Sequence, residues 1–313
     1  MAKVACIGAG LVGSAWATVF ARGGCEVAIF DLGGDASYEK SRRAIAATLE
    51  LLDVSGLLKE PIDTVSARIR FCDTLADAVH GVVHVQESIK EEVNAKRAVF
   101  REMEKLAPAD AVLASSTSAI AGSQFLDIET GARALVAHPV NPPSLIPLVE
   151  LCGTPWTSAE TVARTRDFMT ELGMKPVTLN KEIEGFLLNR LQYTLVAEAL
   201  HLVGEGYCSA ADIDRVITDG LALRWATIGP FEVAHLNSPH GFQGFVDHLG
   251  PMMRRMGESA RTDYPWPPEL ASRIHQEMVA KVPLDKLEER QKWRDANIVA
   301  TRTMQEEAHK RAR

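Results

Sequence analysis

One stretch near the start of the chain decides the fold: VACIGAGLVG, residues 4–13. An apolar run typical of a buried strand leads directly into the pattern G-x-G-x-x-G, and a helical pattern follows. In such a turn Gly8 permits the tight bend, Gly10 lets the backbone approach a diphosphate, and Gly13 lets the helix pack closely on the strand. Because backbone N–H groups at the start of a helix face phosphates, we expect a dinucleotide site built from Gly8, Gly10, Leu11, Val12 and Gly13.

An acidic residue follows at the distance that this motif requires. The second apolar run, Val27–Phe30, leads into Asp31, eighteen residues beyond Gly13. A carboxylate there accepts hydrogen bonds from the ribose hydroxyls of adenosine and repels a 2′-phosphate, which favours NAD over NADP. FAD competes for such turns, but the second nucleotide-contacting segment that flavoproteins usually need is not visible downstream. A purely structural glycine turn beside a surface aspartate is the remaining alternative.

The first part of the chain alternates short apolar runs with helical patterns. This alternation predicts an α/β fold with a Rossmann-type, doubly wound, mainly parallel sheet that carries helices on both faces. The runs expected to be strands are Val4–Ile7, Val27–Phe30, Ile69–Phe71, Val82–Gln86, Ala111–Ala114 and Leu135–His138. Helical patterns dominate from about Glu182 onward. We therefore expect an NAD-binding domain over residues 1–182 and an all-helical domain over residues 183–313.

The composition excludes several classes of protein. The chain has 313 residues, 46% of them hydrophobic and 24% charged, and its net charge is −7. A non-specific nucleic-acid binder would carry a basic excess instead, and no apolar run approaches the ~18–20 residues that cross a membrane. The five cysteines are scattered without a CxxC pair, which indicates neither a metal site nor a disulfide framework. We expect a soluble cytoplasmic protein without nucleic-acid or membrane partners.

Hydroxyl and imidazole groups follow the later strands. Ser116 and Ser118 come just after the run that ends at Ala114, at the edge of the sheet where ligands bind in open α/β folds. His138 ends the next run, and Glu150 follows twelve residues later, beyond a proline-rich turn. A histidine oriented by a carboxylate makes a general base for an alcohol. Taken alone, a histidine at a strand end is more often structural, and a serine there more often closes a turn.

Separated motifs in a fixed order carry a family resemblance. After GAGLVG (8–13), the segments SSTS (115–118), AHPVNPPSLIPLVEL (137–151) and EIEGFLLNRL (182–191) resemble the L-3-hydroxyacyl-CoA dehydrogenase superfamily. LRWATIGPFEVAHLN (223–237) and RQKWRD (290–295) make the chain most similar to its lambda-crystallin / L-gulonate 3-dehydrogenase branch. The resemblance covers essentially the whole chain, and it implies a Rossmann domain that binds NAD, a mainly helical dimerisation domain, and a homodimer.

The resemblance also implies roles for single residues. The hydroxyl-binding serine of the family falls on Ser118, its catalytic histidine on His138, its partner acid on Glu150, and the asparagine of its GF-x-x-NR motif on Asn189. An acid after the fourth strand, in a segment that contacts the cofactor in the family, falls on Glu87. The implied reaction is the oxidation of a secondary alcohol, in which His138 takes the proton and NAD accepts the hydride.

Departures from the acyl-CoA members bear on the substrate. Their NTSS and HFFNP read STSA and HPVNP here, and residues 35–68 are short for the helical hairpin that grips a thioester tail in those members. A free carboxylate needs a cation, and arginine suits it because it binds bidentately. We therefore expect a small L-3-hydroxy acid such as L-gulonate, held by Ser116 and Arg224. A surface arginine paired with a neighbouring acid is the alternative for Arg224.

The sequence is also compatible with other functions. The alternative enzymes are an L-3-hydroxyacyl-CoA dehydrogenase and an L-carnitine dehydrogenase, for which Trp225, Tyr193 or Phe231 would offer an aromatic face to the trimethylammonium group. A non-catalytic, crystallin-like NAD-binding protein is less favoured, because it would not need serine, histidine, glutamate and asparagine together. Several apolar positions of the helical half either form the dimer interface or are buried internally: Leu195, Val196, Leu200 and Leu202.

Overall fold

The computed structural model of the chain describes residues 1–311, and these residues form two compact units. The first unit comprises Met1–Asn189 and the second Arg190–Arg313. The division falls within helix α7 (Leu188–Gly204), a few residues beyond the boundary that the change of sequence pattern suggested.

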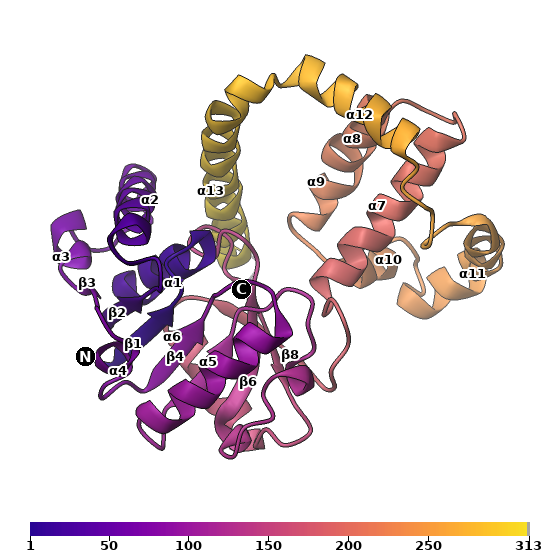
Figure 1. Cartoon of the computed structure of the whole chain (residues 1–313). Coiled ribbons are helices and arrows are strands. Elements are labelled where there is room, and N and C mark those ends of the chain that lie inside the picture. The colour runs from indigo at the N-terminus through magenta and orange to yellow at the C-terminus, as the bar shows by residue number, and fades with distance from the viewer. Residues whose placement is uncertain (312–313) are drawn as a thin grey trace. The chain divides into compact units, whose positions relative to one another are not determined.

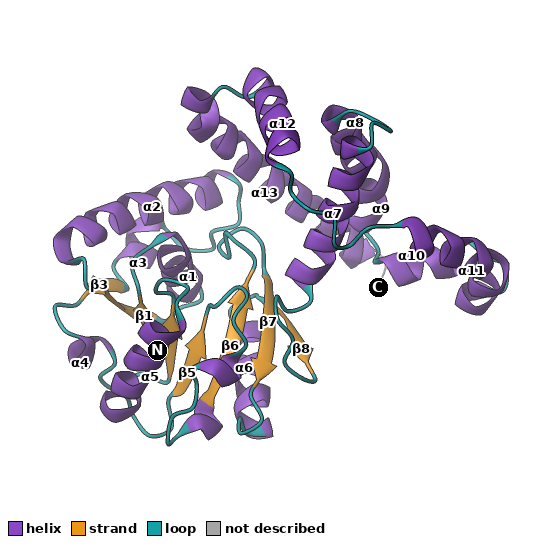
Figure 2. Cartoon of the chain, turned by 45° about the vertical axis from the view of Figure 1, so that its right-hand side comes forward, coloured by secondary structure: helices purple, strands orange, loops and turns teal. Residues whose placement is uncertain are grey.

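The first unit is built around one eight-stranded sheet, whose strands form a single layer (Figures 1 and 2). The strand order is β3-β2-β1-β4-β5-β6-β7-β8; β7 runs antiparallel to β6, β8 runs parallel to β7, and the other neighbours are parallel. The six expected strands are confirmed with small shifts at their ends, and β7 and β8 are additional. The strands are β1 (Lys3–Ile7), β2 (Glu26–Phe30), β3 (Ile69–Phe71), β4 (His84–Glu87), β5 (Val112–Ser115), β6 (Ala134–Pro139), β7 (Leu148–Gly153) and β8 (Lys175–Leu179).

Helices cover both faces of this sheet, as the doubly wound prediction requires. Alternate residues of a strand point to opposite faces, so Val4 and Cys6 of β1 belong to the core that contains Phe20 of the first helix. Ala5 and Ile7 belong to the core on the other face, which contains Phe100. The helices of the first unit are α1 (Leu11–Arg22), α2 (Gly34–Val54), α3 (Ile62–Ser66), α4 (Leu75–Ala78), α5 (Val93–Leu106) and α6 (Ala159–Glu171).

The described residues of the second unit form helices joined by loops, without a strand. Ser209 caps α8 by accepting a hydrogen bond from the backbone N–H of Asp212. After α7, the helices are α8 (Ala210–Arg215), a π-turn over Val216–Leu221, α9 (Ala222–Trp225), α10 (Pro230–Leu236), α11 (Gly241–Ser259), α12 (Pro268–Lys281) and α13 (Leu287–Arg311). Among residues 1–311, no helix combines the length and the apolar character needed to cross a bilayer.

The parallel strands bring the predicted site residues to one edge of the sheet. β1, β4, β5 and β6 all run the same way, so the residues at their carboxyl ends are neighbours. β1 ends in the glycine turn, β4 in Glu87, β5 in Ser115, and β6 in His138 and Pro139. This edge is therefore where a cofactor and a substrate meet in a fold of this type.

Candidate active site

The glycine turn after β1 has the geometry of a nucleotide-binding turn. Gly8 has a φ of 107°, in the region that favours glycine, and a Cβ built on it would lie 2.6 Å from the carbonyl oxygen of Ser88. A Cβ on Gly13 would lie 1.9 Å from the carbonyl oxygen of Gly8, whereas nothing lies within 4 Å of a Cβ built on Gly10. Two glycines thus allow close packing, and Gly10 leaves the start of α1 open toward a ligand. Leu11 is 65% exposed there, and Val12 is half-buried.

Asp31 completes this nucleotide pocket at the end of β2. Its Oδ2 accepts a hydrogen bond from the Ala9 N–H at 2.8 Å, and its Oδ1 accepts one from the Gly33 N–H at 2.7 Å. Each oxygen keeps a lone pair for a ribose hydroxyl. A cavity of about 860 Å³ runs past Gly8, Gly10 and Asp31 to α5. The helix start, the open glycine and the carboxylate all suit NAD.

His138 and Glu150 face each other across neighbouring strands. They are register partners in the antiparallel pair of β6 and β7, which places their side chains on the same face. The His138 Nδ1 lies 2.8 Å from the Glu150 Oε2, and Glu150 Oε1 accepts hydrogen bonds from the N–H groups of Leu187 (2.8 Å) and Leu188 (3.0 Å). Both side chains are almost fully buried, with 5% of His138 exposed and 1% of Glu150.

These contacts fix the protonation pattern of the pair. Burial raises the pKa of Glu150, but the hydrogen bonds from His138, Leu188 and Leu187 outweigh burial and hold that pKa below its usual value. A carboxylate only accepts hydrogen bonds, so Nδ1 of His138 carries a proton toward it. The other ring nitrogen, Nε2, is then left without a proton and can act as a hydrogen-bond acceptor.

The ring of Phe186 packs against the imidazole of His138. Its ring centroid lies 5.1 Å from that of His138, and the side chain is fully buried. Its φ of 51° is unusual for a residue with a side chain, and such backbone conformations gather at functional sites. The sequence predicts no role for Phe186, because a backbone angle leaves no mark in the residue type.

A carboxylate that was not predicted from the sequence organises the loop after β5. Glu91 Oε1 accepts hydrogen bonds from the Thr117 hydroxyl at 2.6 Å, from the backbone N–H of Ser118 at 2.8 Å and from that of Ala119 at 3.1 Å. The Ser118 hydroxyl also donates to this oxygen at 3.3 Å, and Asn189 Nδ2 donates to the Ser118 carbonyl at 2.7 Å. Ser118 and Asn189, which are far apart in the sequence, are therefore in direct contact.

The charge of Glu91 is favoured by these partners. Burial raises its pKa, but the hydrogen bond from Thr117, the charge of Lys96 and the backbone N–H groups outweigh burial and lower the pKa below its usual value. In the sequence Glu91 stands within the charged run Lys90–Glu92, which is typical of a solvated turn. Only its hydrogen bonds in the structure distinguish Glu91 from the other charged residues of this run.

Glu87 is enclosed away from the nucleotide pocket. It is 0% exposed, and its carboxylate binds Lys96 Nζ at 2.8 and 3.1 Å, the Ser115 hydroxyl at 2.6 Å and the Ile89 N–H at 2.7 Å. Burial raises its pKa, and Lys96 opposes that effect. Glu87 is not one of the residues that line the nucleotide cavity. Its contacts fix the backbone of the segment after β4, the segment for which the family resemblance implies contact with the cofactor.

Ser116, expected to bind substrate, instead has its hydroxyl among other side chains. Its Oγ lies 2.7 Å from Gln86 Nε2, 3.1 Å from Trp16 Nε1 and 2.9 Å from Ser88 Oγ. A hydroxyl has one donor and two acceptor positions. Three partners fill them, so the hydroxyl has no position left for a substrate.

Arg224 lies on α9, in the second unit, and is exposed. Its carbonyl oxygen accepts a hydrogen bond from the Thr227 hydroxyl at 2.9 Å. No ion pair of its guanidinium occurs among residues 1–311, so a neighbouring acid does not occupy it there.

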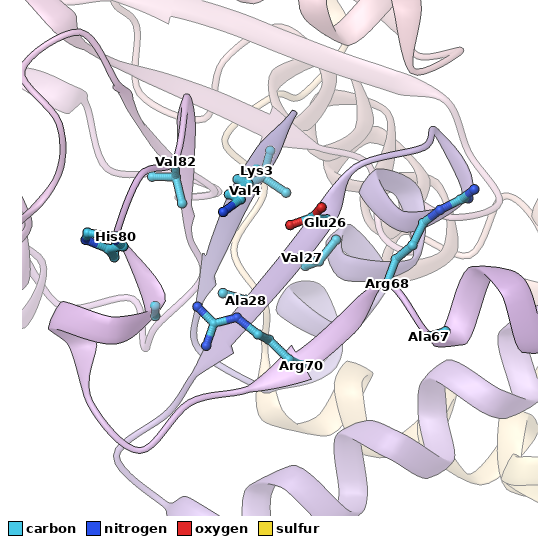
Figure 3. Close-up of a pocket in the computed structure, with 11 residues that line it drawn as sticks. Lys3, Val4, Glu26, Val27, Ala28, Ala67, Arg68, Arg70, His80 and Val82 are labelled. Carbon is cyan, nitrogen blue, oxygen red and sulfur yellow. The ribbon is translucent and has the colours of Figure 1, made fainter. Parts of the chain in front are cut away.

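A second cavity of about 220 Å³ lies at the opposite, amino end of β1 and β2 (Figure 3). Both arginines that line this cavity already form ion pairs with acidic residues. Arg68 binds Glu60 through both terminal nitrogens, at 2.7 and 2.6 Å, and Arg70 binds Asp77 at 2.7 Å. This cavity has no contact with the glycine turn or His138, and we assign the chemistry to the carboxyl edge.

Comparison with known proteins agrees with this geometry. Residues 3–183 match the family model described as 3-hydroxyacyl-CoA dehydrogenase, NAD binding domain, and residues 185–280 match its C-terminal domain. The chain is 40% identical to lambda-crystallin of Oryctolagus cuniculus over 92% of each chain. It is 37% identical to L-carnitine dehydrogenase of Streptomyces coelicolor over 89% of this chain and 85% of that protein.

A solved structure extends the similarity to the whole fold. The chain is similar to 5-formyl-3-hydroxy-2-methylpyridine 4-carboxylic acid 5-dehydrogenase, an NAD⁺-dependent dismutase, with a TM-score of 0.84 and 27% identity over 98% of this chain and 99% of that one. The family models and the similar proteins support the NAD-binding fold of the first unit. The chain therefore belongs to the 3-hydroxyacyl-CoA dehydrogenase family, as an NAD-dependent oxidoreductase that acts on a CH–OH group.

Proposed function

We propose that the protein oxidises the 3-hydroxyl of a small L-3-hydroxy acid, similar to L-gulonate, to the 3-keto acid. The contact between His138 Nδ1 and Glu150 Oε2 at 2.8 Å carries this proposal. It orients an imidazole whose second nitrogen is available to a substrate, at the edge of the sheet that also holds the nucleotide turn.

In the proposed mechanism, Nε2 of His138 removes the proton of the substrate hydroxyl. Glu150 stabilises the imidazolium that forms, and its bonds to Leu187 and Leu188 keep it in place. The Ser118 hydroxyl releases its long hydrogen bond of 3.3 Å to Glu91 and, together with the remaining N–H of Asn189, donates to the substrate oxygen. NAD bound in the pocket supplies the hydride acceptor. General base catalysis of this kind contributes roughly 10²–10⁴-fold to the rate.

Several observations favour a small acid over a CoA ester. The segment between β2 and β3 holds a single long helix, α2, and the five-residue α3, which supports the expectation that the long helical hairpin is lacking. Arg224 is exposed and free of ion pairs among the described residues, so it is available to a carboxylate. The similarity to lambda-crystallins over most of the chain points to the same branch.

L-Carnitine is the second candidate substrate, and the similarity to L-carnitine dehydrogenases favours it. Carnitine is also a 3-hydroxy acid, so the same base and the same arginine would serve. Its trimethylammonium group would need an aromatic face, and Tyr193, Trp225 and Phe231 are all exposed in the second unit.

A steady-state screen tests the proposal. NADH formation is measured with NAD⁺ and, in parallel, L-gulonate, L-carnitine, L-3-hydroxybutyrate and an L-3-hydroxyacyl-CoA. We expect the highest kcat/KM with L-gulonate, and an Arg224→Ala variant should raise KM for L-gulonate more than for the acyl-CoA. A kcat/KM for the acyl-CoA that exceeds that for L-gulonate by orders of magnitude would overturn the choice of substrate, and dominance of L-carnitine would replace it with the second candidate.

We also propose that the protein is a cytoplasmic homodimer. The hydrophobic residues that the second unit buries are few for its size, and exposed aromatic residues gather where α10 meets α11: Phe231 and Phe242 are 75% and 42% exposed, with ring centroids 5.8 Å apart. Apolar surface of this kind is typical of subunit interfaces. The hydrophobic residues buried in the second unit, within residues 190–311, are Ala197, Leu200, Val203, Ala234, Leu270 and Val299.

Light scattering coupled to size exclusion tests the dimer. The expected mass is twice the 34.1 kDa of one chain. Phe231→Glu should shift the protein toward the monomer, whereas the matched change Val54→Glu on α2, at a residue 88% exposed in the first unit, should not. A monomer at micromolar wild-type protein would contradict the proposal.

A further inference from the structure

Ser88 stands at the point where β4 meets the glycine turn. It follows β4 directly, and its N–H donates to the Ile7 carbonyl at 2.7 Å, which fixes its backbone beside β1. Its side chain is half-buried, and the residue lines the same cavity as Gly8, Gly10 and Asp31. Ser88 is therefore held at the wall of the nucleotide pocket.

The hydrogen bonds that connect the core to Ser88 allow only one assignment of donors and acceptors. Trp16 Nε1 is a donor without acceptor capacity, and it donates to Ser116 Oγ at 3.1 Å. Gln86 Nε2 donates to Ser116 Oγ at 2.7 Å, and it also donates to the Ala137 carbonyl at 3.3 Å, which fixes which end of the amide is nitrogen. Both acceptor positions of Ser116 are thus filled.

The buried end of this chain of hydrogen bonds is His84. Its Nε2 lies 3.0 Å from Gln86 Oε1, and because that oxygen can only accept, Nε2 carries the proton. Burial lowers the pKa of His84 to about 4, so the ring stays neutral near neutral pH. The direction of the hydrogen bonds is therefore set inside the core, where no water competes.

The single proton of Ser116 must then go to Ser88. Their hydroxyl oxygens are 2.9 Å apart, and either could in principle donate. Since Ser116 already accepts two hydrogen bonds, it donates to Ser88. The hydroxyl of Ser88 is left as a donor that points away from Ser116, at the wall of the nucleotide cavity.

We infer that the Ser88 hydroxyl donates a hydrogen bond to an oxygen of the nicotinamide-side ribose of bound NAD. Asp31 at the end of β2 suits the adenosine ribose, and the turn after β1 suits the diphosphate. The sheet order β2-β1-β4 places Ser88 on the far side of that turn from Asp31. The next part of an extended dinucleotide lies there.

This inference rests on NAD binding and not on the identity of the substrate. It also gives Ser116 a role in place of substrate binding: Ser116 positions the donor by filling the acceptor side of Ser88. Because Ser116 stands two residues before Ser118, one loop both orients this cofactor contact and carries the serine proposed to hold the substrate oxygen.

Binding measurements with three ligands test the inference. The dissociation constants of NADH, ADP-ribose and ADP are measured by calorimetry for the wild type, Ser88→Ala, Ser88→Cys and the control Ser66→Ala, which removes an exposed hydroxyl from α3. Ser88→Ala should weaken NADH and ADP-ribose about 3- to 10-fold, the range that one hydrogen bond is worth. ADP lacks the second ribose, and its binding should stay within about twofold of the wild type, which also shows that the pocket is folded.

Ser88→Cys keeps the size of the side chain, but its thiol is a weak hydrogen-bond donor. It should therefore behave more like Ser88→Ala than like the wild type.

The opposite results are equally clear. NADH binding by Ser88→Ala equal to that of the Ser66→Ala control would show that the hydroxyl makes no contact with the cofactor. A loss for ADP as large as that for NADH would place the contact on the diphosphate or the adenosine half, and either result overturns the inference. Failure of every candidate substrate in the activity screen would leave this test unaffected.

A double-mutant cycle tests the direction of these hydrogen bonds. If Ser116 acts only through Ser88, Ser116→Ala should weaken NADH in the wild-type background and have no further effect in the Ser88→Ala background. Additive losses in the two backgrounds would show that Ser116 contacts a ligand by itself, and would contradict donation from Ser116 to Ser88.

Discussion

Two buried carboxylates lie at the same edge of the sheet, each with a basic partner. They are enclosed to a similar extent, but they differ in the chemistry that their partners allow. Glu150 bonds to His138, and Glu87 bonds to Lys96; both carboxylates are almost completely enclosed. His138 keeps a second ring nitrogen, and 5% of its side chain is exposed. Lys96 is 1% exposed and has both Glu87 and Glu91 as partners.

The difference lies in the partner and not in the acid. An imidazole exchanges a proton near neutral pH and still contacts its carboxylate through the other nitrogen. A buried ammonium that is paired on all sides has no route by which to pass a proton to a ligand. We therefore propose a catalytic role for the His138–Glu150 cluster, and a structural role for the Glu87–Lys96 cluster in supporting the segment after β4 and the serine loop.

The largest effect is expected from Glu150→Gln. The glutamine amide can donate to Nδ1 of His138, which would move the imidazole proton to Nε2 and remove the base. We expect kcat to fall about 10²–10⁴-fold while the dissociation constant of NADH changes little. Steady-state kinetics and NADH titration measure the two. A kcat within about threefold of the wild type would mean that the acid does not orient the base.

Lys96→Met should lower the free energy of unfolding rather than kcat. Removing one partner of a buried ion pair costs about 3–5 kcal/mol, because the other charge stays buried without compensation. The matched control is Arg97→Met on the same helix, which breaks the half-exposed pair with Asp127 and should cost at most about 1 kcal/mol. Urea unfolding compares them. Equal losses for the two variants would contradict the structural role of the Glu87–Lys96 cluster.

A third acid at this edge, Asp31, is half-buried and has no cationic partner among the described residues. Asp31→Ser should weaken NADH about 10-fold, the lower end for losing hydrogen bonds to a charged group. Binding of NADPH should change less or improve, because the repulsion of its 2′-phosphate is removed. Fluorescence titration with both cofactors tests this, and an unchanged preference would show that Asp31 does not face the ribose.

The smallest expected effect is on acid stability. The pKa values of Glu150 and Glu91 are lowered in the folded state, so the unfolded chain binds protons first as the pH falls. Their contribution to the free energy of unfolding is complete above the unfolded pKa of about 4.3 and is lost as the pH falls through the folded values. Urea midpoints between neutral pH and pH 3 should fall less steeply for Glu91→Gln than for the wild type, and parallel curves would contradict this.

Most of the sheet could be predicted because buried parallel strands are apolar without interruption. β7 and β8 were missed for different reasons. Glu150 stands in the middle of β7, and a charged residue in a short apolar run does not suggest a central strand. β8 is an edge strand whose residues are mostly exposed, so its sequence KPVTL lacks a clear apolar pattern.

The site could be predicted where a residue type is rare for its position, as with His138 and Asp31. It could not be predicted where the role depends on three-dimensional hydrogen bonding. Glu91 is one acid in a charged run, and four contacts with the serine loop distinguish it. Ser116 is left to donate to Ser88 because Trp16 and Gln86 fill the acceptor positions of Ser116, and no spacing in the sequence reveals that.

The most direct test of His138 as the base is to measure turnover and cofactor binding in His138→Asn side by side. Asparagine keeps a polar side chain at β6 but cannot accept the proton of an alcohol near neutral pH. We predict that kcat with the best substrate falls about 10²–10⁴-fold, while the dissociation constant of NADH stays within about threefold of the wild type. Retention of more than about a tenth of the wild-type activity would contradict the assignment of His138 as the general base.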